Sequence, residues 1–224
     1  MGLCPERIAV IPNMASSNGI EPSSGQGQFV AYVGRVSPEK GISTLIAAAT
    51  KCPDIPFRIV GSYDRMPSVL KQAPRNCIFA GHLTGTELEE CYKSSRIVVL
   101  PSLWFEGIPT VLVDSMMAGK PVVASRIGGI PEIVDDGITG LMFEPGNAED
   151  LAEKTRNLWN RSDVCRQMGQ AGREKALREY SPDKYYERLM AAYERAIELG
   201  PGEASGVSQV VARKSHISAK DHGL

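Results

Sequence analysis

The sequence predicts an α/β protein: a Rossmann-like, doubly wound parallel sheet with additional helices at its C-terminal end. From Phe29 onward, short apolar segments alternate with helical segments, and this pattern is typical of a parallel sheet that helices cover on both faces. The segment Ile97–Leu100 is apolar throughout and mostly β-branched, as expected of a strand buried on both faces. At 224 residues, the chain is long enough for one such domain with extra helices and short for two.

The predicted strands are short and are followed by glycine, proline or polar residues. They span residues 29–34, 57–61, 77–81, 97–100, 122–124 and 140–143, and a further strand is predicted ahead of them at Ile8–Ile11.

The predicted helices have recognisable ends. Thr84 and Glu87 have the spacing of a capping box at the start of helix 84–94. Pro109 occupies the first position of a helix that runs to about Ala118, because its fixed φ suits that position and its missing N–H is not needed there. The other helices are predicted over residues 38–51, 66–73, 147–160, 162–179 and 182–199.

These elements divide the chain into four predicted regions. Residues 1–28 form a linker and first strand, residues 29–180 the sheet domain, residues 181–199 a C-terminal helix, and residues 200–224 a flexible tail. The aromatic stripe of the C-terminal helix predicts packing against the sheet domain or a neighbouring domain. A chain that starts shortly before a strand and a linker is expected to be a piece of a longer protein.

The composition points to a small-molecule ligand. The net charge is −1 without a basic block, which disfavours a nucleic-acid surface, and no apolar segment approaches the ~18 residues of a membrane-spanning helix. The five cysteines are scattered and contain no C-x-x-C pair, as expected of a reduced cytoplasmic protein, and neither they nor the three histidines predict a metal site.

The candidate site follows the first and fourth sheet strands. In a doubly wound sheet these strands are neighbours, and ligands bind beyond their carboxyl ends. The loop after the first strand contains Gly34, which permits a close turn, and the cations Arg35 and Lys40. A second helix N-terminus, at Thr110 and Val111, is expected to point its amide groups toward the same place.

This combination suits a diphosphate, because a guanidinium, an ammonium and free helix N–H groups all favour bound anions. The alternative is that Arg35 and Lys40 are ordinary solvated surface charges. A dinucleotide fingerprint is excluded, because the positions that would require glycine hold Val36 and Glu39.

Two carboxylates belong to the segment after the fourth strand. Glu106 lies on the loop, and Asp114 lies in a helix whose neighbours are almost all apolar. A carboxylate in such a helix needs a hydrogen-bonding partner or an opening. Asp114 therefore either points to solvent on the outer face or faces a ligand that has hydroxyl groups.

Four blocks of the sequence together resemble a known family. GRVSPEKG, FAGHLTGTEL, PSLWFEGIPTVLVDSMMAGKPVVAS and GGIPEIVDDGITGLMFEPGNAEDLA resemble, in order and spacing, the family-4 retaining glycosyltransferases of the GT-B fold, over roughly residues 5–199. The matching part of that family is the C-terminal, donor-binding half of a two-domain enzyme.

The resemblance implies the following roles at the candidate site. Arg35 and Lys40 hold the diphosphate of a nucleoside-diphosphate sugar. Glu106, with the amides of Gly107 and Ile108, holds hydroxyl groups of the donor sugar.

It also implies contacts to the rest of the nucleotide. The amides of Thr110 and Val111 touch a phosphate, and Ile78 and Phe79 match the place where the base rests on backbone groups. Asp114 matches the acid that binds the ribose diol, although the family usually has Glu there.

Two glycine turns complete the implied site. Gly61 and Ser62 form the turn near the nucleotide, and the loop at Gly128–Gly129 borders the cleft. Without the resemblance, Gly128 and Gly129 are ordinary turn glycines.

The implied reaction transfers a hexose-type sugar from the nucleoside-diphosphate sugar to an acceptor hydroxyl with retention of the anomeric configuration. It implies no metal and no cofactor beyond that substrate. It also implies a missing N-terminal acceptor-binding domain, without which transfer is expected to be feeble. Peripheral membrane attachment through that domain stays open.

Two other classes of function remain open. An epimerase or phosphorylase on the same fold would give an altered donor sugar or a phosphorolysis product. A non-catalytic nucleotide-sugar-binding module would give no turnover, and the aspartate at position 114 is the best argument for it.

Overall fold

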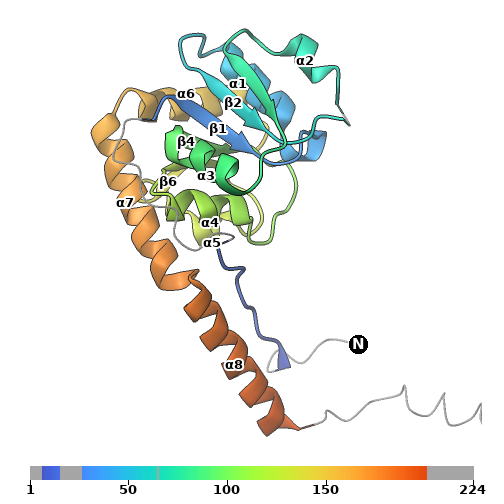
Figure 1. Ribbon diagram of the computed structural model, residues 1–224, viewed down its shortest axis with the longest axis vertical. Helices are drawn as coiled ribbons and strands as arrows, with labels where there is room; N and C mark the ends of the chain where they lie inside the picture. Colours follow the sequence, from blue (N-terminus) through green and yellow to red (C-terminus); the bar gives the residue numbers. More distant parts are fainter. Residues whose placement is uncertain (1–6, 16–26, 65, 201–224) are drawn as a thin grey trace, which may run out of the picture. The chain divides into compact units, whose positions relative to one another are not determined.

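The computed structural model describes residues 7–15, 27–64 and 66–200. Six parallel strands form one sheet in the order β3-β2-β1-β4-β5-β6 (Figure 1). The strands are β1 (Phe29–Val33), β2 (Phe57–Val60), β3 (Cys77–Gly81), β4 (Ser95–Leu100), β5 (Val122–Ser125) and β6 (Gly140–Phe143). Because β1 and β4 are neighbours from which the chain winds outward in both directions, the predicted doubly wound α/β fold is confirmed.

The helices follow the strands in alternation. They are the 3₁₀ turn η2 (Pro38–Lys40) and the helices α1 (Ile42–Thr50), α2 (Val69–Gln72), α3 (Gly85–Ser94), α4 (Thr110–Met117), α5 (Ile130–Ile133), α6 (Ala148–Trp159), α7 (Ser162–Glu179) and α8 (Pro182–Leu199).

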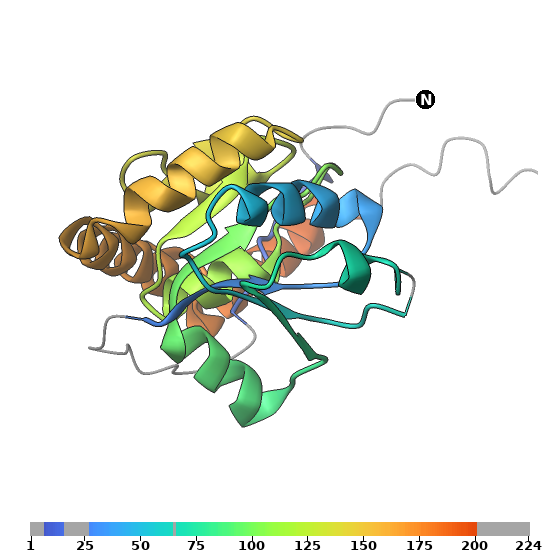
Figure 2. The same cartoon turned by 90° about the horizontal axis from the view of Figure 1, so that it is seen from above.

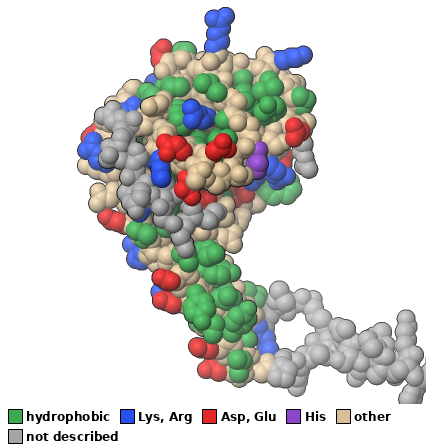
Figure 3. All heavy atoms as spheres, in the orientation of Figure 1, with side chains coloured by type: hydrophobic (Ala, Val, Ile, Leu, Met, Phe, Trp, Pro, Cys, Tyr) green, Lys and Arg blue, Asp and Glu red, His purple; other side chains and the backbone are tan. Residues whose placement is uncertain are grey.

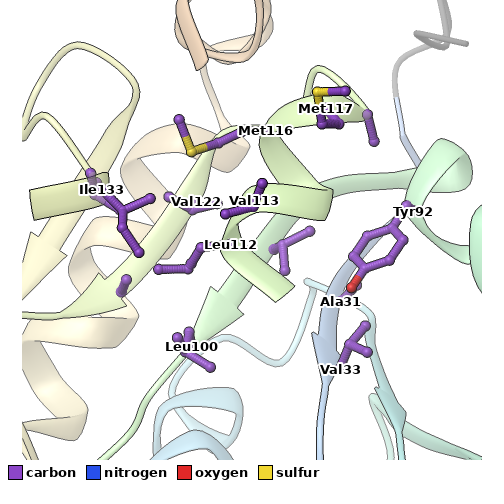
Figure 4. Packing of buried hydrophobic residues seen from close by; sticks show 14 of the residues in the cluster. Ala31, Val33, Tyr92, Leu100, Leu112, Val113, Met116, Met117, Val122 and Ile133 are labelled. Atoms are coloured by element: carbon purple, nitrogen blue, oxygen red, sulfur yellow. The ribbon is translucent and has the colours of Figure 1, made fainter. Parts of the chain in front are cut away.

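The sheet is buried on both faces because its strands are apolar at successive positions. On β1, Val30 and Tyr32 face a core with α1 and α6, whereas Ala31 faces a core with α3, α4 and α5. Figure 2 shows these helices on opposite faces of the sheet. In Figure 4, Leu112 and Met116 of α4 lie within the second of these cores. The predicted two-sided burial is therefore confirmed.

Some local predictions are wrong. Ile8–Ile11 is not a strand: it is not among the six strands of the sheet, and strand geometry requires a partner ladder. The helix predicted over residues 38–51 is interrupted at Gly41, whose left-handed conformation separates η2 from α1. Thr84 is the N-cap of α3, but its side chain makes no capping hydrogen bond, since an exposed helix start can use water instead.

Asn76 ties the end of α1 to the start of β3. Its Nδ2 donates to the carbonyls of Ala49, Cys52 and Ile55 at 3.1, 2.8 and 2.8 Å. We expect Asn76→Ala to lower the free energy of unfolding by about 2–3 kcal/mol, because several half-buried carbonyls lose their donor at once. Urea unfolding measures this change. Asn157→Ala is the control, because the Asn157 side chain accepts a hydrogen bond from the exposed Arg161, and a loss as large there would contradict the role of Asn76.

The described residues divide into two compact units, residues 12–185 and a smaller unit of residues 7–11 and 186–200. In the smaller unit, the Arg7 guanidinium donates to the carbonyls of Leu199 and Gly200, both at 3.4 Å, at the C-terminal end of α8. Figure 3 shows hydrophobic side chains gathered along α8, and Tyr186, Tyr193 and Ile197 are all more than half exposed. What this stripe packs against stays a prediction.

Two further predictions concern the ends of the chain and the membrane. The predicted flexible tail lies outside the described residues, apart from Gly200. Among the described residues, no helix is both long and apolar enough to cross a membrane.

Candidate ligand site

The loop after β1 and the loop after β4 are joined in three places. The Lys40 ammonium lies 2.5 Å from Oε1 of Glu106. The Leu103 N–H donates to the Glu39 carbonyl at 2.9 Å, and Gly41 lies directly against the carbonyl of Pro101. The expectation that these two loops meet in space is therefore confirmed.

The Glu106 carboxylate is held from two sides. Oε1 accepts hydrogen bonds from the Lys40 ammonium and from the hydroxyl of Ser102, which is fully buried. The side chains of Glu106 and Lys40 are 13% and 22% exposed. Lys40 is therefore not an ordinary solvated surface charge, and that alternative is wrong for it.

The loop after β5 supports the backbone of the same acid. The Gly129 N–H donates to the Glu106 carbonyl at 2.8 Å. A Cβ atom on Gly128 would lie 2.6 Å from that carbonyl oxygen, and one on Gly129 would lie 2.4 Å from the Gly107 carbonyl oxygen. Side chains at these positions would push the loops apart, so the glycine pair allows the close approach.

Arg35 is more exposed than Lys40. Its side chain is 61% exposed, and its guanidinium lies 3.8 Å from the Glu39 carboxylate, one turn along the loop. The hydroxyl of the buried Tyr32 donates to the Arg35 carbonyl at 2.6 Å. Burial, and after it the charge of Glu106, raises the pKa of Tyr32 above its ordinary value, so this hydroxyl keeps its proton for the bond.

We expect Tyr32→Phe to weaken nucleoside-diphosphate binding about 3- to 10-fold, because the Arg35 backbone loses one hydrogen bond that holds the loop. Titration calorimetry measures the affinity. Tyr186→Phe is the control, because Tyr186 lies on α8 and is more than half exposed. Equal effects of the two substitutions would contradict a specific role for the Tyr32 hydroxyl.

Asp114 is buried. Only 6% of the residue is exposed, although it lies in the middle of α4, and so the alternative that it points to solvent is wrong. Its charge also acts on a neighbouring side chain: burial first, and then the Asp114 carboxylate, raises the pKa of Tyr92 on α3. The ribose contact of Asp114 stays a prediction.

The predicted phosphate-binding amides lie at the start of α4. Pro109 is its N-cap rather than its first helical residue, and Thr110 and Val111 form its first turn. Just before it, the Ile108 carbonyl accepts a hydrogen bond from the Asn13 side chain at 3.4 Å. Gly107 and Ile108 thus connect Glu106 directly to this helix N-terminus.

The turns after β1, β2 and β3 form a hydrogen-bonded row. The Gly34 N–H donates to the Val60 carbonyl at 2.9 Å, and the Gly61 N–H donates to the Gly81 carbonyl at 2.7 Å. Gly61 also approaches the Gly34 backbone so closely that a Cβ atom would lie 1.8 Å from its carbonyl oxygen. This row places Gly34 and Gly61 at the same edge of the sheet as Lys40.

The two positions predicted to carry the base lie further back. Ile78 is the second residue of β3 and more than half exposed, and Phe79 follows it and packs against Tyr63. Neither is at the carboxyl end of the strand, which is Gly81. Their contact with a base stays a prediction.

Three contacts at the site were missed in the sequence: the Ser102 hydroxyl on Glu106, the Tyr32 hydroxyl on Arg35, and the Gly129 amide on Glu106. A usable signal existed for Ser102, because it is a small polar residue two positions after a buried strand and four residues before the acid. Among the described residues, no cluster of three or more His, Cys, Asp or Glu residues has an arrangement suited to a metal ion.

The fold and this site define a class of protein: a doubly wound α/β domain with a cation, an acid and a helix N-terminus at its topological switch point. Residues 16–175 match the family model described as glycosyl transferases group 1. The chain therefore belongs to the glycosyl transferases group 1 family, and it has the fold of the C-terminal domain of a GT-B glycosyltransferase, as the resemblance implied.

Named relatives support this assignment. The chain is 33% identical over 163 residues to a protein named sulfoquinovosyl transferase SQD2 from Arabidopsis thaliana, covering 69% of this chain and 31% of that protein. It is 30% identical over 185 residues to an α-maltose-1-phosphate synthase of Mycolicibacterium smegmatis, covering 75% and 48%. The chain thus spans about a third to a half of the length of these relatives.

Solved structures show the same fold. A sucrose-phosphate synthase from Thermosynechococcus elongatus superposes with a TM-score of 0.71 at 26% identity, covering 78% of this chain and 46% of that one. The C-terminal domain of a glycosyl transferase group 1 protein from Francisella tularensis superposes with a TM-score of 0.64 at 23% identity, covering 73% and 96%.

Proposed function

We propose that this chain is the donor-binding domain of a retaining glycosyltransferase, which moves a sugar from a nucleoside-diphosphate sugar to an acceptor hydroxyl. The observation that carries the proposal is the ion pair of Lys40 and Glu106 beside the start of α4. It puts a cation suited to a diphosphate next to an acid suited to sugar hydroxyls, at the edge of the sheet where this fold binds ligands.

The ligand class has further support from a solved relative. The Anabaena protein HepE, which superposes on this chain with a TM-score of 0.70, has been solved in complex with UDP-glucose. A nucleoside-diphosphate sugar combines the two chemical groups that Lys40 and Glu106 suit.

The proposed chemistry depends on charge that develops on the leaving diphosphate. The Lys40 ammonium and the Arg35 guanidinium stabilise that charge, and the amides of Thr110 and Val111 add the positive end of α4. Interactions that strengthen as the sugar departs lower the barrier, whereas those already complete in the bound substrate do not. These groups supply positive charge without a metal ion, and so we propose that none is required.

Glu106 orients the sugar in this proposal. Its Oε1 is engaged by Lys40 and Ser102, and a donor-sugar hydroxyl is the partner we assign to Oε2. Retention is proposed to follow from attack by the acceptor on the face that the diphosphate leaves. The acceptor is bound by a second domain, which lies on the part of the full enzyme that this chain does not match.

Asp114 is proposed to bind the ribose diol. Asp114 is 6% exposed and lies in α4, the helix whose first amides are proposed to contact the phosphate. Free thiols at Cys52, Cys77, Cys91 and Cys165 support a cytoplasmic location, where such thiols stay reduced.

Calorimetric titration of the chain with UDP-glucose, GDP-mannose and ADP-glucose tests donor binding. We expect one of the three to bind and Asp114→Asn to weaken it, with Asp54→Asn on an exposed turn as the control. Absence of binding by all three would overturn the proposal. A second assay uses the enzyme with its acceptor-binding half present. Formation of free nucleoside diphosphate and a glycosylated acceptor would show sugar transfer, which distinguishes it from an epimerase, a phosphorylase and a non-catalytic binding module.

A further inference from the structure

Among the described residues, Ser102 is the one uncharged side chain that donates a hydrogen bond to the Glu106 carboxylate. It lies two residues after β4, it is fully buried, and its hydroxyl donates to Oε1 of Glu106. Lys40 donates to the same oxygen at 2.5 Å. Both hydrogen bonds that the described residues donate to this carboxylate thus go to one oxygen, and Oε2 keeps its lone pairs for another donor.

The two donors differ in what else they can do. The Lys40 ammonium has a flexible stem and three donor hydrogens, and its charge is attracted to a diphosphate. The Ser102 hydroxyl has a single donor hydrogen, and its short side chain is enclosed by the core. If Lys40 turned toward a bound diphosphate, the hydrogen bond from Ser102 to the carboxylate would remain.

Hydrogen bonds also hold the backbone of the loop that carries Glu106. Gly129 holds the Glu106 carbonyl and Glu39 holds the Leu103 amide, so the backbone on both sides of the acid is already fixed. The carboxylate itself can still rotate about the end of its side chain, and that rotation decides where Oε2 points. Ser102 restricts this remaining freedom.

We propose that Ser102 is a positioning residue, which fixes the Glu106 carboxylate so that Oε2 faces the donor sugar while Lys40 is shared with the diphosphate. This inference rests on the proposed function, because it concerns the sugar that Glu106 binds. It assigns Ser102 an effect on the sugar part of the ligand and none on the nucleotide part.

The test compares two affinities in the same protein. The Kd values of the chain for a nucleoside diphosphate and for its sugar ester are measured by calorimetry, with UDP, GDP and ADP paired with UDP-glucose, GDP-mannose and ADP-glucose. We expect Ser102→Ala to weaken binding of the sugar ester about 3- to 10-fold, the worth of one hydrogen bond, and to leave the nucleoside diphosphate within about 2-fold.

Ser95→Ala is the matched control. Ser95 is also fully buried, begins the same strand, and donates its hydroxyl to the Tyr92 carbonyl at 2.8 Å, at the opposite end of β4. Ser95→Ala removes a hydroxyl oxygen and one hydrogen bond, as Ser102→Ala does, but the hydrogen bond that it removes does not involve Glu106. Ser102→Cys is the second variant, which retains a weaker hydrogen-bond donor at this position and should show an intermediate loss for the sugar ester.

The outcomes separate the two proposals. If the unmodified chain binds the sugar ester but Ser102→Ala leaves the ratio of the two Kd values unchanged, the role of Ser102 is overturned and the proposed function is not. An equal loss for both ligands also overturns it, because a merely structural residue would act on both. Failure of the unmodified chain to bind any of the three sugar esters overturns the proposed function, and this inference with it.

Discussion

Replacing Lys40 with methionine is expected to lower the rate of sugar transfer about 10²- to 10³-fold in the enzyme that contains this domain, the loss typical of one preorganised electrostatic donor. The substitution keeps most of the volume of the stem and removes the charge that faces the diphosphate. It also leaves the Glu106 carboxylate, only 13% exposed, with Ser102 as its remaining donor among the described residues. Release of nucleoside diphosphate measures the rate.

Lys51→Met is the matched control for this result. The Lys51 ammonium also lies 2.5 Å from a carboxylate, that of Glu149 on α6, but these side chains are 43% and 69% exposed, and Lys51 caps the C-terminal end of α1. We expect a change in rate of less than about 2-fold, since an exposed ion pair contributes at most about 1 kcal/mol to stability. If Lys40→Met and Lys51→Met retained similar rates, the assignment of Lys40 to the diphosphate would be wrong.

Gly41→Ala is expected to cause the largest loss of stability among the substitutions considered. Gly41 has a φ of 71°, and a Cβ atom there would lie 1.7 Å from the carbonyl oxygen of Pro101. The left-handed conformation costs a non-glycine residue about 1–2 kcal/mol, and overpacking adds about 1–3 kcal/mol. We therefore expect the free energy of unfolding to fall by about 2–5 kcal/mol, measured by urea unfolding.

The same substitution should weaken binding of the sugar nucleotide, because it separates the loop of Lys40 from the loop of Glu106. Gly137→Ala separates the cost of the left-handed conformation from the cost of the contact with Pro101. Gly137 has a φ of 80°, but a Cβ atom there would meet nothing within 4 Å. Its loss should be limited to the conformational cost of about 1–2 kcal/mol, without an effect on binding. Equal losses for the two variants would show that contact with Pro101 is unimportant.

Much of the fold could be predicted because its signals are local. An unbroken apolar run such as Ile97–Leu100 identifies a doubly buried strand, and Gly119, with a φ of 69°, ends α4 where the sequence places the end. The adjacency of β1 and β4 followed from the rule for doubly wound sheets, and with it the meeting of the loops that carry Lys40 and Glu106. Ile8–Ile11 failed because apolar character without a pairing edge does not produce a strand.

The amino-acid sequence by itself determined the alternation of strands and helices, the edge at which the candidate site lies, and its charged residues, because periodicity and chain order are written along the chain. Only the tertiary structure decided the state of each side chain. It buried Asp114, paired Lys40 with Glu106, and brought Ser102 and Gly129 onto the same acid. These contacts depend on how packing of the core brings separate segments together and orients their side chains. The order of residues along the chain does not specify those distances.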